Sequence, residues 1–485
     1  MRRSLALGLA ASLLVATACK DSNIPFFTAP TSIPNSLPGI QNAVTGLVSA
    51  TRGTNDFFGF LVDATGFARD GANYTNTEPR FILYELGLQP IDPAWSGAWP
   101  GFYTNILQAH QIITAVPAVL PALSSQQRNA IIGVVQTLEA LNYMMIAEDH
   151  DTAGISIMPL APTTAPPGLC VRDGWKYIVA LLDSANNALV AAGGTALPVK
   201  LPSGFNAVSA DANHFSSLNR ALAAKAGLEL AYAIARGPGG NPPTPSSPGS
   251  PDQTALQRAD SAMLASTLYN PGALAPNPAG GFAPDAYSVL HNFSATSGDV
   301  VNPINQNIGT YVVLKNIPAN QDTINDLRWR TKFVANPLTP QQPGYSAAVS
   351  PYIYNYYPAP GSFMPIVRNE ELVLVRAQIQ LGLGQFATAA TLINDVRTAV
   401  GGLAPAAIGA DYVSTRDALL HEQQISTAFE PSADRMIALR MYGVAAQQDA
   451  ITWTGSGKTD LFTTEEPIPF AEAAARGGTF SKTCP

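Results

Sequence analysis

One stretch of the sequence combines aromatic rings with hydrogen-bonding side chains and has no helical pattern. It runs from Ala64 to Pro93 and is rich in Asn, Asp, Gly and aromatic residues. A long segment of this kind inside a helical protein is typical of a functional loop. A sugar ring offers an apolar face and a rim of hydroxyls, so proteins bind it with exposed aromatic planes beside Arg, Asn and Asp. The candidate ligand-binding residues in and just after this stretch are Phe67, Arg69, Asp70, Asn73, Tyr74 and Trp95.

A second aromatic segment without helical periodicity lies between residues 270 and 365. Trp329 is a further candidate ligand contact. For every one of these rings the competing interpretation is packing in the core, which we favour for Trp99 because it belongs to a helical stripe. Four tyrosines could extend the ligand surface, namely Tyr352, Tyr354, Tyr356 and Tyr357.

No group of residues in the sequence predicts catalysis. The five histidines are scattered without HExxH or His-x-His spacing, and there is no G-x-S-x-G nucleophile elbow. Residues 148–151 (Glu-Asp-His-Asp) are four possible metal ligands, but consecutive side chains seldom converge on one ion. We expect them at a helix end exposed to water. The neighbours Glu370 and Glu371 point apart on a helix and are expected to make scaffold salt bridges. We therefore predict no catalytic residue, no metal ligand and no cofactor.

Composition narrows the class of protein. The 485 residues suffice for a large core, and only 13 % of them are charged. The net charge of −7 argues against a nucleic-acid partner and against a polybasic membrane patch. Glycine and proline are abundant but cluster in connections, which is typical of a folded protein with long loops.

The first 18 residues have the pattern of a targeting segment. Two arginines precede an apolar run, Leu5 to Val15, which is too short to cross a bilayer. Residues 16–19 (Ala-Thr-Ala-Cys) resemble a bacterial lipobox, in which Cys19 would become the first mature residue and carry the lipid. The alternative is an ordinary secretory peptide that leaves Cys19 free. We expect a lipid anchor on Cys19 and no membrane-spanning helix.

Two further cysteines, Cys170 and Cys484, are then left. In an oxidising compartment they could form one disulfide that ties the C-terminus to a mid-chain loop. Their spacing does not show whether they meet, so a disulfide and two free thiols both stay open.

The clearest helical pattern runs from Asn369 to Val400. Its first half is apolar over a wide arc, which predicts a helix buried on more than one side. Gly382 and Gly384 interrupt the pattern, and a second helix starts at Gln385 or Phe386. The short connection requires an antiparallel pair, and its spacing resembles a tetratricopeptide turn.

Similar patterns predict a mostly α protein, built as a tetratricopeptide-like scaffold of helical pairs with long irregular loops and a few short strands. We expect one domain over residues 19–485, with helical repeats at about 94–268 and 366–445 and an irregular ligand-binding excursion at about 270–365. A short strand is expected at 311–314. The other expected helices are residues 40–49, 56–63, 94 onwards, 126–147, 170–192, 215–236 and 255–268.

Several motifs, in this order along the chain, carry a family resemblance. Residues 326–328 (Asp-Leu-Arg) come first, and the hairpin follows with Glu371, a leucine run, a glycine turn and Asn394 with Arg397. Glu422 and Glu430 then occur with the expected spacing, and a Pro-Ile-Pro signature closes the chain at residues 467–469. Behind a lipobox, this ordered set resembles the SusD/RagB-like nutrient-binding outer-membrane lipoproteins.

The resemblance implies a non-catalytic lipoprotein that binds a glycan or another oligomeric nutrient. It also implies a TonB-dependent, SusC-like outer-membrane transporter as the partner, and a lipid-anchored position at the cell surface. The residues leave two other classes open. One is a lipid-anchored, glycan-active hydrolase whose carboxylates meet only in the fold, and the other is a helical-repeat scaffold that binds protein peptides.

Overall fold

The computed structural model describes residues 35–52, 71–73, 93–119, 122–157, 168–236, 250–276, 286–291, 304–305, 310–314, 320–335, 352–354, 363–428, 430, 434–444, 452–453, 458–459, 465, 468–475 and 484. The predicted helix at 56–63 and the targeting segment with Cys19 lie outside these residues. The helices are α2 (Leu37–Arg52), α5 (Pro93–Ala115), α6 (Ser125–His150), α7 (Val171–Ala192), α8 (Ala212–Ala235), α9 (Gln253–Ala265), α10 (Leu327–Lys332), α11 (Asn369–Gly382), α12 (Phe386–Ala399), α13 (Tyr412–Ser426), α14 (Asp434–Met441) and α15 (Phe470–Ala475). The short 3-10 helices are η1 (Val116–Val119), η2 (Asp151–Ala153), η3 (Ser203–Phe205) and η4 (Pro271–Ala273).

The strands are short and come mostly from the second half of the chain. They are β1 (Gly71–Asn73), β2 (Ile155–Ser156), β3 (Gly168–Leu169), β4 (Val289–His291), β5 (Ile304–Asn305), β6 (Thr310–Leu314), β7 (Phe333–Ala335), β8 (Tyr352–Tyr354), β9 (Met364–Val367), β10 (Thr452–Trp453) and β11 (Lys458–Thr459). The mostly α fold class and the predicted strand at 311–314 are confirmed.

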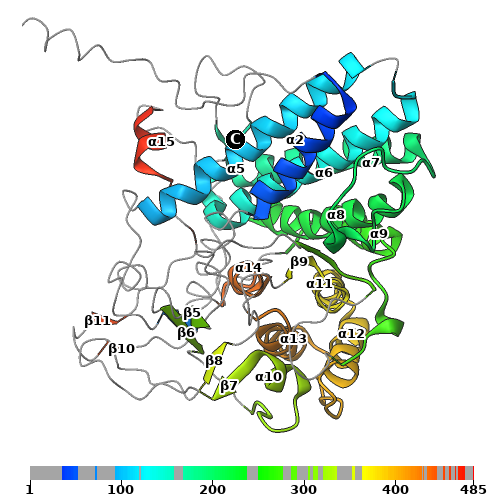
Figure 1. Cartoon of the computed structure of the whole chain (residues 1–485). Helices are drawn as coiled ribbons and strands as arrows, with labels where there is room; N and C mark the ends of the chain where they lie inside the picture. The colour runs from blue at the N-terminus through cyan, green and yellow to red at the C-terminus, as the bar shows by residue number, and fades with distance from the viewer. Residues whose placement is uncertain are drawn as a thin grey trace, which may run out of the picture.

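The helices form two layers (Figure 1). In the N-terminal layer, α5 to α9 pack in chain order, each against the next, and α2 packs along α5. The C-terminal layer contains α11, α12 and α13 in mutual contact, with α14 against α13. Helix α11 also contacts α8 and α9, so it joins the two layers. Neighbour-on-neighbour packing of this kind lets each helical pair bury an apolar face that it could not bury alone.

Helix α6 is the long central helix of the N-terminal layer. Ser124 caps its start, because its Oγ accepts from the Gln127 N–H at 3.1 Å while the Gln127 side chain accepts from the Ser124 N–H at 2.9 Å. The helix is long and apolar enough to cross a membrane, but 89 % of its most apolar window is buried inside the protein. It is therefore a core helix of this fold.

The hairpin α11–α12 agrees with its sequence prediction in both helices and in the turn. Gly384 adopts φ +75°, a left-handed conformation that glycine adopts without steric strain. Gly382 is required for packing, since a Cβ there would lie 2.8 Å from Leu256 Cδ1 on α9. The turn thus fixes the hairpin and also seats it on the N-terminal layer.

The C-terminal part of the chain is fastened to the end of α6. Cys170 and Cys484 form a disulfide with a Cα–Cα distance of 5.2 Å, which decides between the two possibilities that spacing left open. The Glu465 carboxylate accepts from the Thr152 backbone N–H at 2.8 Å. One covalent and one polar contact therefore attach the chain end beside η2 and the start of α7.

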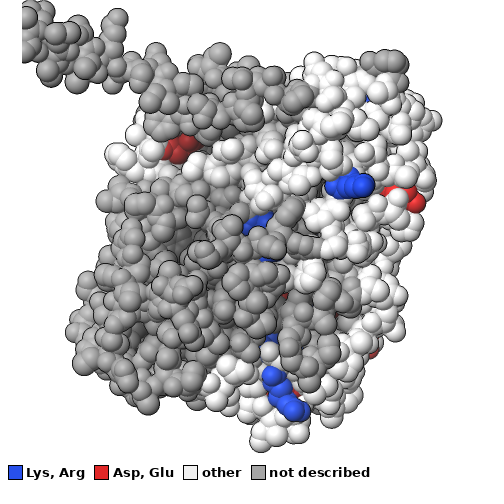
Figure 2. Space-filling model, in the orientation of Figure 1, with Lys and Arg blue, Asp and Glu red and all other residues white. Residues whose placement is uncertain are grey.

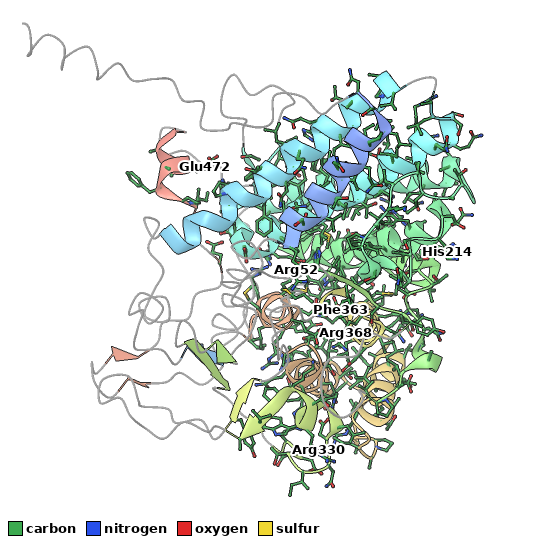
Figure 3. All side chains as sticks on the ribbon, viewed as in Figure 1. Arg52, His214, Arg330, Phe363, Arg368 and Glu472 are labelled. Carbon is green, nitrogen blue, oxygen red and sulfur yellow. A yellow bond between two sulfur atoms is a disulfide. The ribbon has the colours of Figure 1, made fainter. Side chains whose placement is uncertain are left out.

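The described surface of the face shown in Figure 2 is mostly uncharged, with isolated Lys, Arg, Asp and Glu side chains. This agrees with the low charged fraction of the sequence. Many charged side chains of this protein are inside it. Figure 3 shows the contrast between Arg330, at the outer edge of α10, and Arg368, in the interior between the layers.

Candidate functional site

The predicted ligand-binding residues fall at the edge of the described structure. Phe67, Arg69, Asp70 and Tyr74 lie outside the described residues. Asn73 is the last residue of β1, and Trp95 lies in the first turn of α5. Their role as ligand contacts stays a prediction.

The backbone nevertheless shows what surrounds this loop. Strand β1 pairs antiparallel with β6, with Gly71 opposite Leu314 and Asn73 opposite Val312. Strand β6 in turn pairs with β5 and β8, and β8 pairs with β7. The sheet therefore joins the aromatic loop of residues 64–93 to the distant excursion of residues 270–365, and it lies to one side of the helical layers (Figure 1).

Trp329 corrects the sequence prediction, because its side chain is buried at 2 % exposure. Its ring centroid lies 4.4 Å from that of Phe333 and 5.0 Å from that of Tyr352. A buried ring cannot stack on a sugar, so Trp329 is a core residue beneath the sheet. The sequence shows that residue 329 is aromatic, but it does not show that this residue lies on the buried side of α10.

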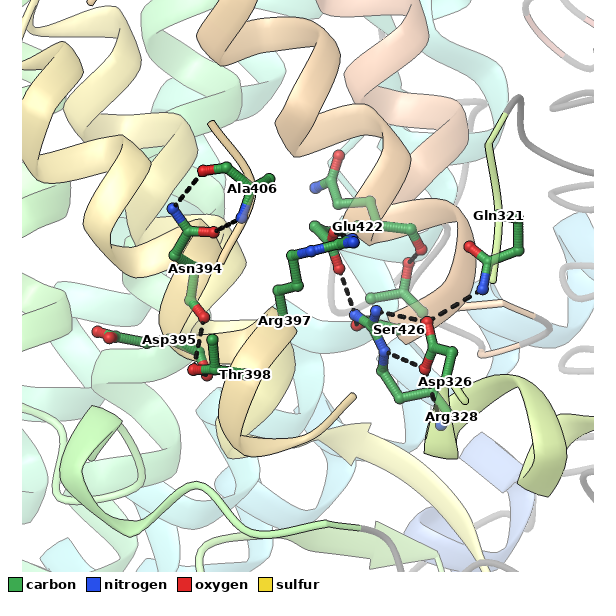
Figure 4. Close-up of polar contacts among 12 residues, drawn as sticks. Gln321, Asp326, Arg328, Asn394, Asp395, Arg397, Thr398, Ala406, Glu422 and Ser426 are labelled. Carbon is green, nitrogen blue, oxygen red and sulfur yellow. Dashed lines mark hydrogen bonds and ion pairs between the residues drawn. The ribbon is translucent and has the colours of Figure 1, made fainter. Parts of the chain in front are cut away.

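A buried set of ion pairs holds α10 and β7 on the C-terminal layer. We call it the clamp cluster and define it as Asp326, Arg328, Lys332, Arg368, Glu370, Arg397, Glu422 and Glu430. Its centre is Arg328, which donates to Asp326 at 2.8 and 3.0 Å and to Glu422 at 2.6 Å (Figure 4). Arg397 donates to the other oxygen of Glu422 at 2.8 Å.

The second half of the clamp cluster centres on Glu430. Lys332 donates to Glu430 Oε1 at 2.8 Å, and Arg368 donates to both Glu430 oxygens at 2.5 and 3.0 Å. Arg368 also donates to Glu370 at 2.7 Å. Both Lys332 and Arg368 donate to the carbonyl oxygen of Ser426, at the end of α13. Each cation thus meets an acidic or carbonyl oxygen, as buried charge requires.

The clamp cluster lowers the pKa of two of its carboxyl groups. Burial alone raises the pKa of Asp326, but hydrogen bonds and charge from Arg328 outweigh it and hold that pKa below 3.8. Burial likewise raises the pKa of Glu370, and the charges of Arg368 and Lys332 outweigh it and lower that pKa below 4.5. These ion pairs serve to fix geometry, because the pKa of Asp326 and that of Glu370 both lie far below neutral pH.

The acidic end of α6 is the second correction. We expected residues 148–151 in water, yet each of the four is buried. Asp151 pairs with Arg236 at 2.6 and 2.7 Å and lies 3.4 Å from Arg440. Arg440 also donates to the Glu148 carbonyl oxygen at 2.9 Å. The partners come from α14 and from the end of α8, far away in the sequence, and local pattern cannot reveal them.

The family-like motifs contain Asp326, Arg328, Glu422 and Glu430, but the sequence alone indicates no role for these residues. It missed Lys332 and Arg368 altogether, although a basic residue six places after Asp326 was available as a signal. Within the part of the chain that the structure describes, no group of three or more His, Cys, Asp or Glu side chains could hold a metal ion. The expected scaffold salt bridges of Glu370 and Glu371 are confirmed, to Arg368 and Lys225 respectively.

Comparison with known proteins identifies the fold. No family model and no curated protein matches the sequence. A SusD superfamily protein from Bacteroides thetaiotaomicron is similar in structure over 91 % of this chain and 98 % of its own, with a TM-score of 0.62 and 14 % identity. Another from Bacteroides vulgatus covers 91 % and 97 %, with a TM-score of 0.62 and 16 % identity.

A SusD-like carbohydrate binding protein from Bacteroides fragilis is also similar. It covers 91 % of this chain and 98 % of its own, with a TM-score of 0.59 and 12 % identity. At such identities the similarity defines the fold alone. The protein has the SusD-like fold, as the ordered motifs led us to expect.

Proposed function

We propose that this protein is a non-catalytic, lipid-anchored binding protein that captures a carbohydrate at the outer membrane. The SusD-like fold supports the proposal, and one structure with that fold is described as a carbohydrate binding protein. The observation that carries it is the pairing of β1 with β6, because it brings the aromatic loop of residues 64–93 and the aromatic excursion into one sheet.

The proposed site is the surface formed by that loop at the sheet. Phe67, Tyr74 and Trp95 would supply planes for sugar rings, and Arg69, Asp70 and Asn73 would bond to hydroxyls. Trp329 has no place in this set, since it lies in the core. Instead it supports β7 and β8 from beneath, while the clamp cluster fixes α10 to α13.

The experiment is binding of the protein from residue 19 onwards to a panel of polysaccharides and oligosaccharides, by affinity gel and calorimetry. We expect Trp95→Ala and Tyr74→Ala each to lower the affinity about 5- to 150-fold, by analogy with the about 1–3 kcal/mol that a nucleic-acid base gains by stacking on an aromatic side chain. Tyr269→Ala is the matched control, because Tyr269 stacks on Arg376 between α9 and α11, away from the sheet.

Three other results would each have a different meaning. Equal loss of binding in all three variants would show a general defect and would not place the site. Release of smaller sugars during the assay would show a hydrolase instead. If no carbohydrate binds, a peptide or another nutrient becomes the ligand to test.

The proposal includes a TonB-dependent, SusC-like transporter as the partner that receives the ligand. The lipobox-like segment ending at Cys19 supports a lipid anchor beside such a barrel. Purification of the full chain from membranes should recover the transporter, and Cys19→Ser should release the protein from the membrane fraction. A Cys19→Ser protein that stays in the membrane fraction would refute the anchor.

A further inference from the structure

Five elements contribute charged side chains to a buried cluster between the two helical layers. We call it the seam cluster and define it as Glu148, Asp151, Lys225, Glu229, Arg236, Glu371, Asp434 and Arg440. They come from α6, η2, α8 and its C-terminal cap, α11 and α14. Lys225, Glu229 and Arg236 follow one stripe of α8, so this helix presents charge to all the others.

Three members of the seam cluster make close contact. The Lys225 ammonium lies 2.5 Å from Glu371 Oε1 and 3.0 Å from Asp434 Oδ1. All three residues are more than nine-tenths buried. One positive charge therefore stands between two carboxyl groups in the interior, and it can balance only one of them.

The two carboxyl groups converge on this one ammonium. An oxygen of Glu371 and an oxygen of Asp434 each lie within 3.0 Å of the same Lys225 nitrogen. Asp434 Oδ2 accepts no hydrogen bond from any N–H or O–H donor among the described residues. Two ionised carboxylates are both acceptors and cannot bond to each other, whereas a protonated one donates to its neighbour. A single proton on this pair of carboxyl groups would give Asp434 Oδ2 a hydrogen to donate and would remove the excess negative charge.

We propose that Lys225, Glu371 and Asp434 form a proton-binding site, in which the two carboxyl groups share one proton at neutral pH and lose it under alkaline conditions, weakening the joint between the helical layers. Without the proton, two buried negative charges face each other across one ammonium. Their repulsion acts between α11 and α14, and the loss of the shared bond loosens both from α8.

The other charged groups around the triad support this assignment. Burial raises the pKa of Glu371 to about 8 and also raises that of Asp434, while the charge of Lys225 offsets part of each effect. Burial also raises the pKa of Glu229 to about 7 and that of Glu148 above 4.5. Burial alone would lower the pKa of Lys225, but the three nearby acids outweigh it, so the lysine stays charged.

Among the described residues, the other charged groups that face the triad do not supply a second compensating cation. Glu430, beside Glu371 and Asp434, adds negative charge, and it is already paired with Arg368 and Lys332. Arg236 and Arg440 lie toward Asp151 and Glu229. The triad therefore keeps its own excess of acid.

The sign of the pH effect follows from linkage. The folded protein holds a proton that the unfolded chain releases above about 4.5, so stability is present at low pH and is lost as pH rises through about 8. Between about pH 4.5 and 8, the unfolding equilibrium constant should therefore rise about tenfold per pH unit for each proton of this kind. His291 and His421 do not contribute there, because burial lowers the pKa of each imidazole.

The test is equilibrium unfolding of the mature protein in urea between pH 7 and 8.5, for the wild type and Asp434→Asn. The asparagine amide donates to Glu371 as the shared proton would. We expect the variant to lose about one proton's worth of pH dependence and to be more stable than the wild type at pH 8.5. Asp183→Asn, on an exposed residue of α7, should leave the dependence unchanged.

A merely structural role for Asp434 would lower stability equally at every pH, and that result would overturn the proposal. If Asp434→Asn does not fold, the wild type alone decides the question. Unfolding in weakly buffered solution at pH 7.5 should release protons, and infrared spectra of the folded protein should show a protonated carboxyl that disappears above pH 9. Absence of both signals would refute the site.

Discussion

The clamp cluster and the seam cluster are both buried and both connect helices that are far apart in the sequence, but they differ in charge balance. Among the described residues, the clamp cluster has four basic and four acidic members, whereas the seam cluster has three basic and five acidic members. The balanced set lowers the pKa of its acids Asp326 and Glu370. The unbalanced set raises the pKa of Glu371 and Glu229.

This difference teaches what a buried ion pair can contribute. When charges balance, removal from water is compensated by specific hydrogen bonds, and the result is a fixed geometry under the sheet. When acids exceed bases, the surplus is neutralised by protons, and the joint becomes sensitive to pH. The fold thus contains one cluster that fixes geometry, the clamp cluster, and one whose stability depends on pH, the seam cluster.

Loss of one partner in the clamp cluster should have the largest effect. Replacing Arg328 by Met keeps most of the volume but leaves Asp326 and Glu422 buried with less compensation. We expect the free energy of unfolding to fall by about 3–5 kcal/mol, measured in urea at pH 7. Arg330→Met is the matched control on the exposed face of α10, with an expected change within about 0.5 kcal/mol. Similar losses in both variants would show that the buried pairs are not special.

Removal of the disulfide should have the second-largest effect on stability, and this effect does not depend on charge. The double variant Cys170→Ser, Cys484→Ser should lower the free energy of unfolding by about 2–4 kcal/mol, because the cross-link restricts an unfolded loop of 314 residues. Wild-type protein in reductant should unfold at the same urea concentration as this variant. A wild-type midpoint insensitive to reductant would contradict the assigned bond.

The two clusters should act at opposite ends of the pH scale. In the clamp cluster, Asp326 and Glu370 have lowered pKa values, so their contribution to stability is present above about pH 4 and is lost as pH falls. In the seam cluster, Glu229 and Glu371 have raised pKa values, so their contribution to stability is lost as pH rises through about 7 to 8. Stability measured from pH 3 to 9 should therefore peak between these limits and fall by about 1.4 kcal/mol per pH unit for each proton. A profile flat above pH 6 would remove the distinction between the clusters.

The smallest expected effect concerns Glu229, a second seam-cluster acid with a raised pKa. Glu229→Gln replaces a carboxyl whose burial raises its pKa to about 7 by a neutral group of the same shape. We expect a gain of about 1 kcal/mol at pH 8 and little change at pH 5. Asp417→Asn, on an exposed residue, is the control that should show no such difference between the two pH values. A loss at pH 8 would show that ionised Glu229 is needed by Arg236 and Arg440.

The sequence predicts the scaffold better than the site. Helical periodicity located the hairpin of α11 and α12 because apolar spacing and a glycine turn are local signals. The sequence predicts that residues 148–151 lie in water. They are buried instead, because Arg236 and Arg440 become neighbours of Asp151 only in the fold. The sequence predicts Trp329 on the ligand surface. This prediction is wrong because the residue type does not show which side of the six-residue helix α10 faces the core.

The pairing of β1 with β6 shows a similar limit. A three-residue strand has too little alternation to be recognised, and its partner lies far away in the chain. The motif residues Asp326 and Glu422 were visible in the sequence, but their contact through Arg328 was not. Long-range charge and strand pairing are what the structure adds.

The central claim is that a carbohydrate binds where the loop of residues 64–93 joins the sheet. Hydrogen exchange of the mature protein, with and without a carbohydrate found in the binding panel, tests it most directly. The account predicts slower exchange in residues 64–93 together with β6 and β8, and unchanged exchange in α7 and α9. Protection confined to the helical layers, with no change in the loop or the sheet, would contradict it.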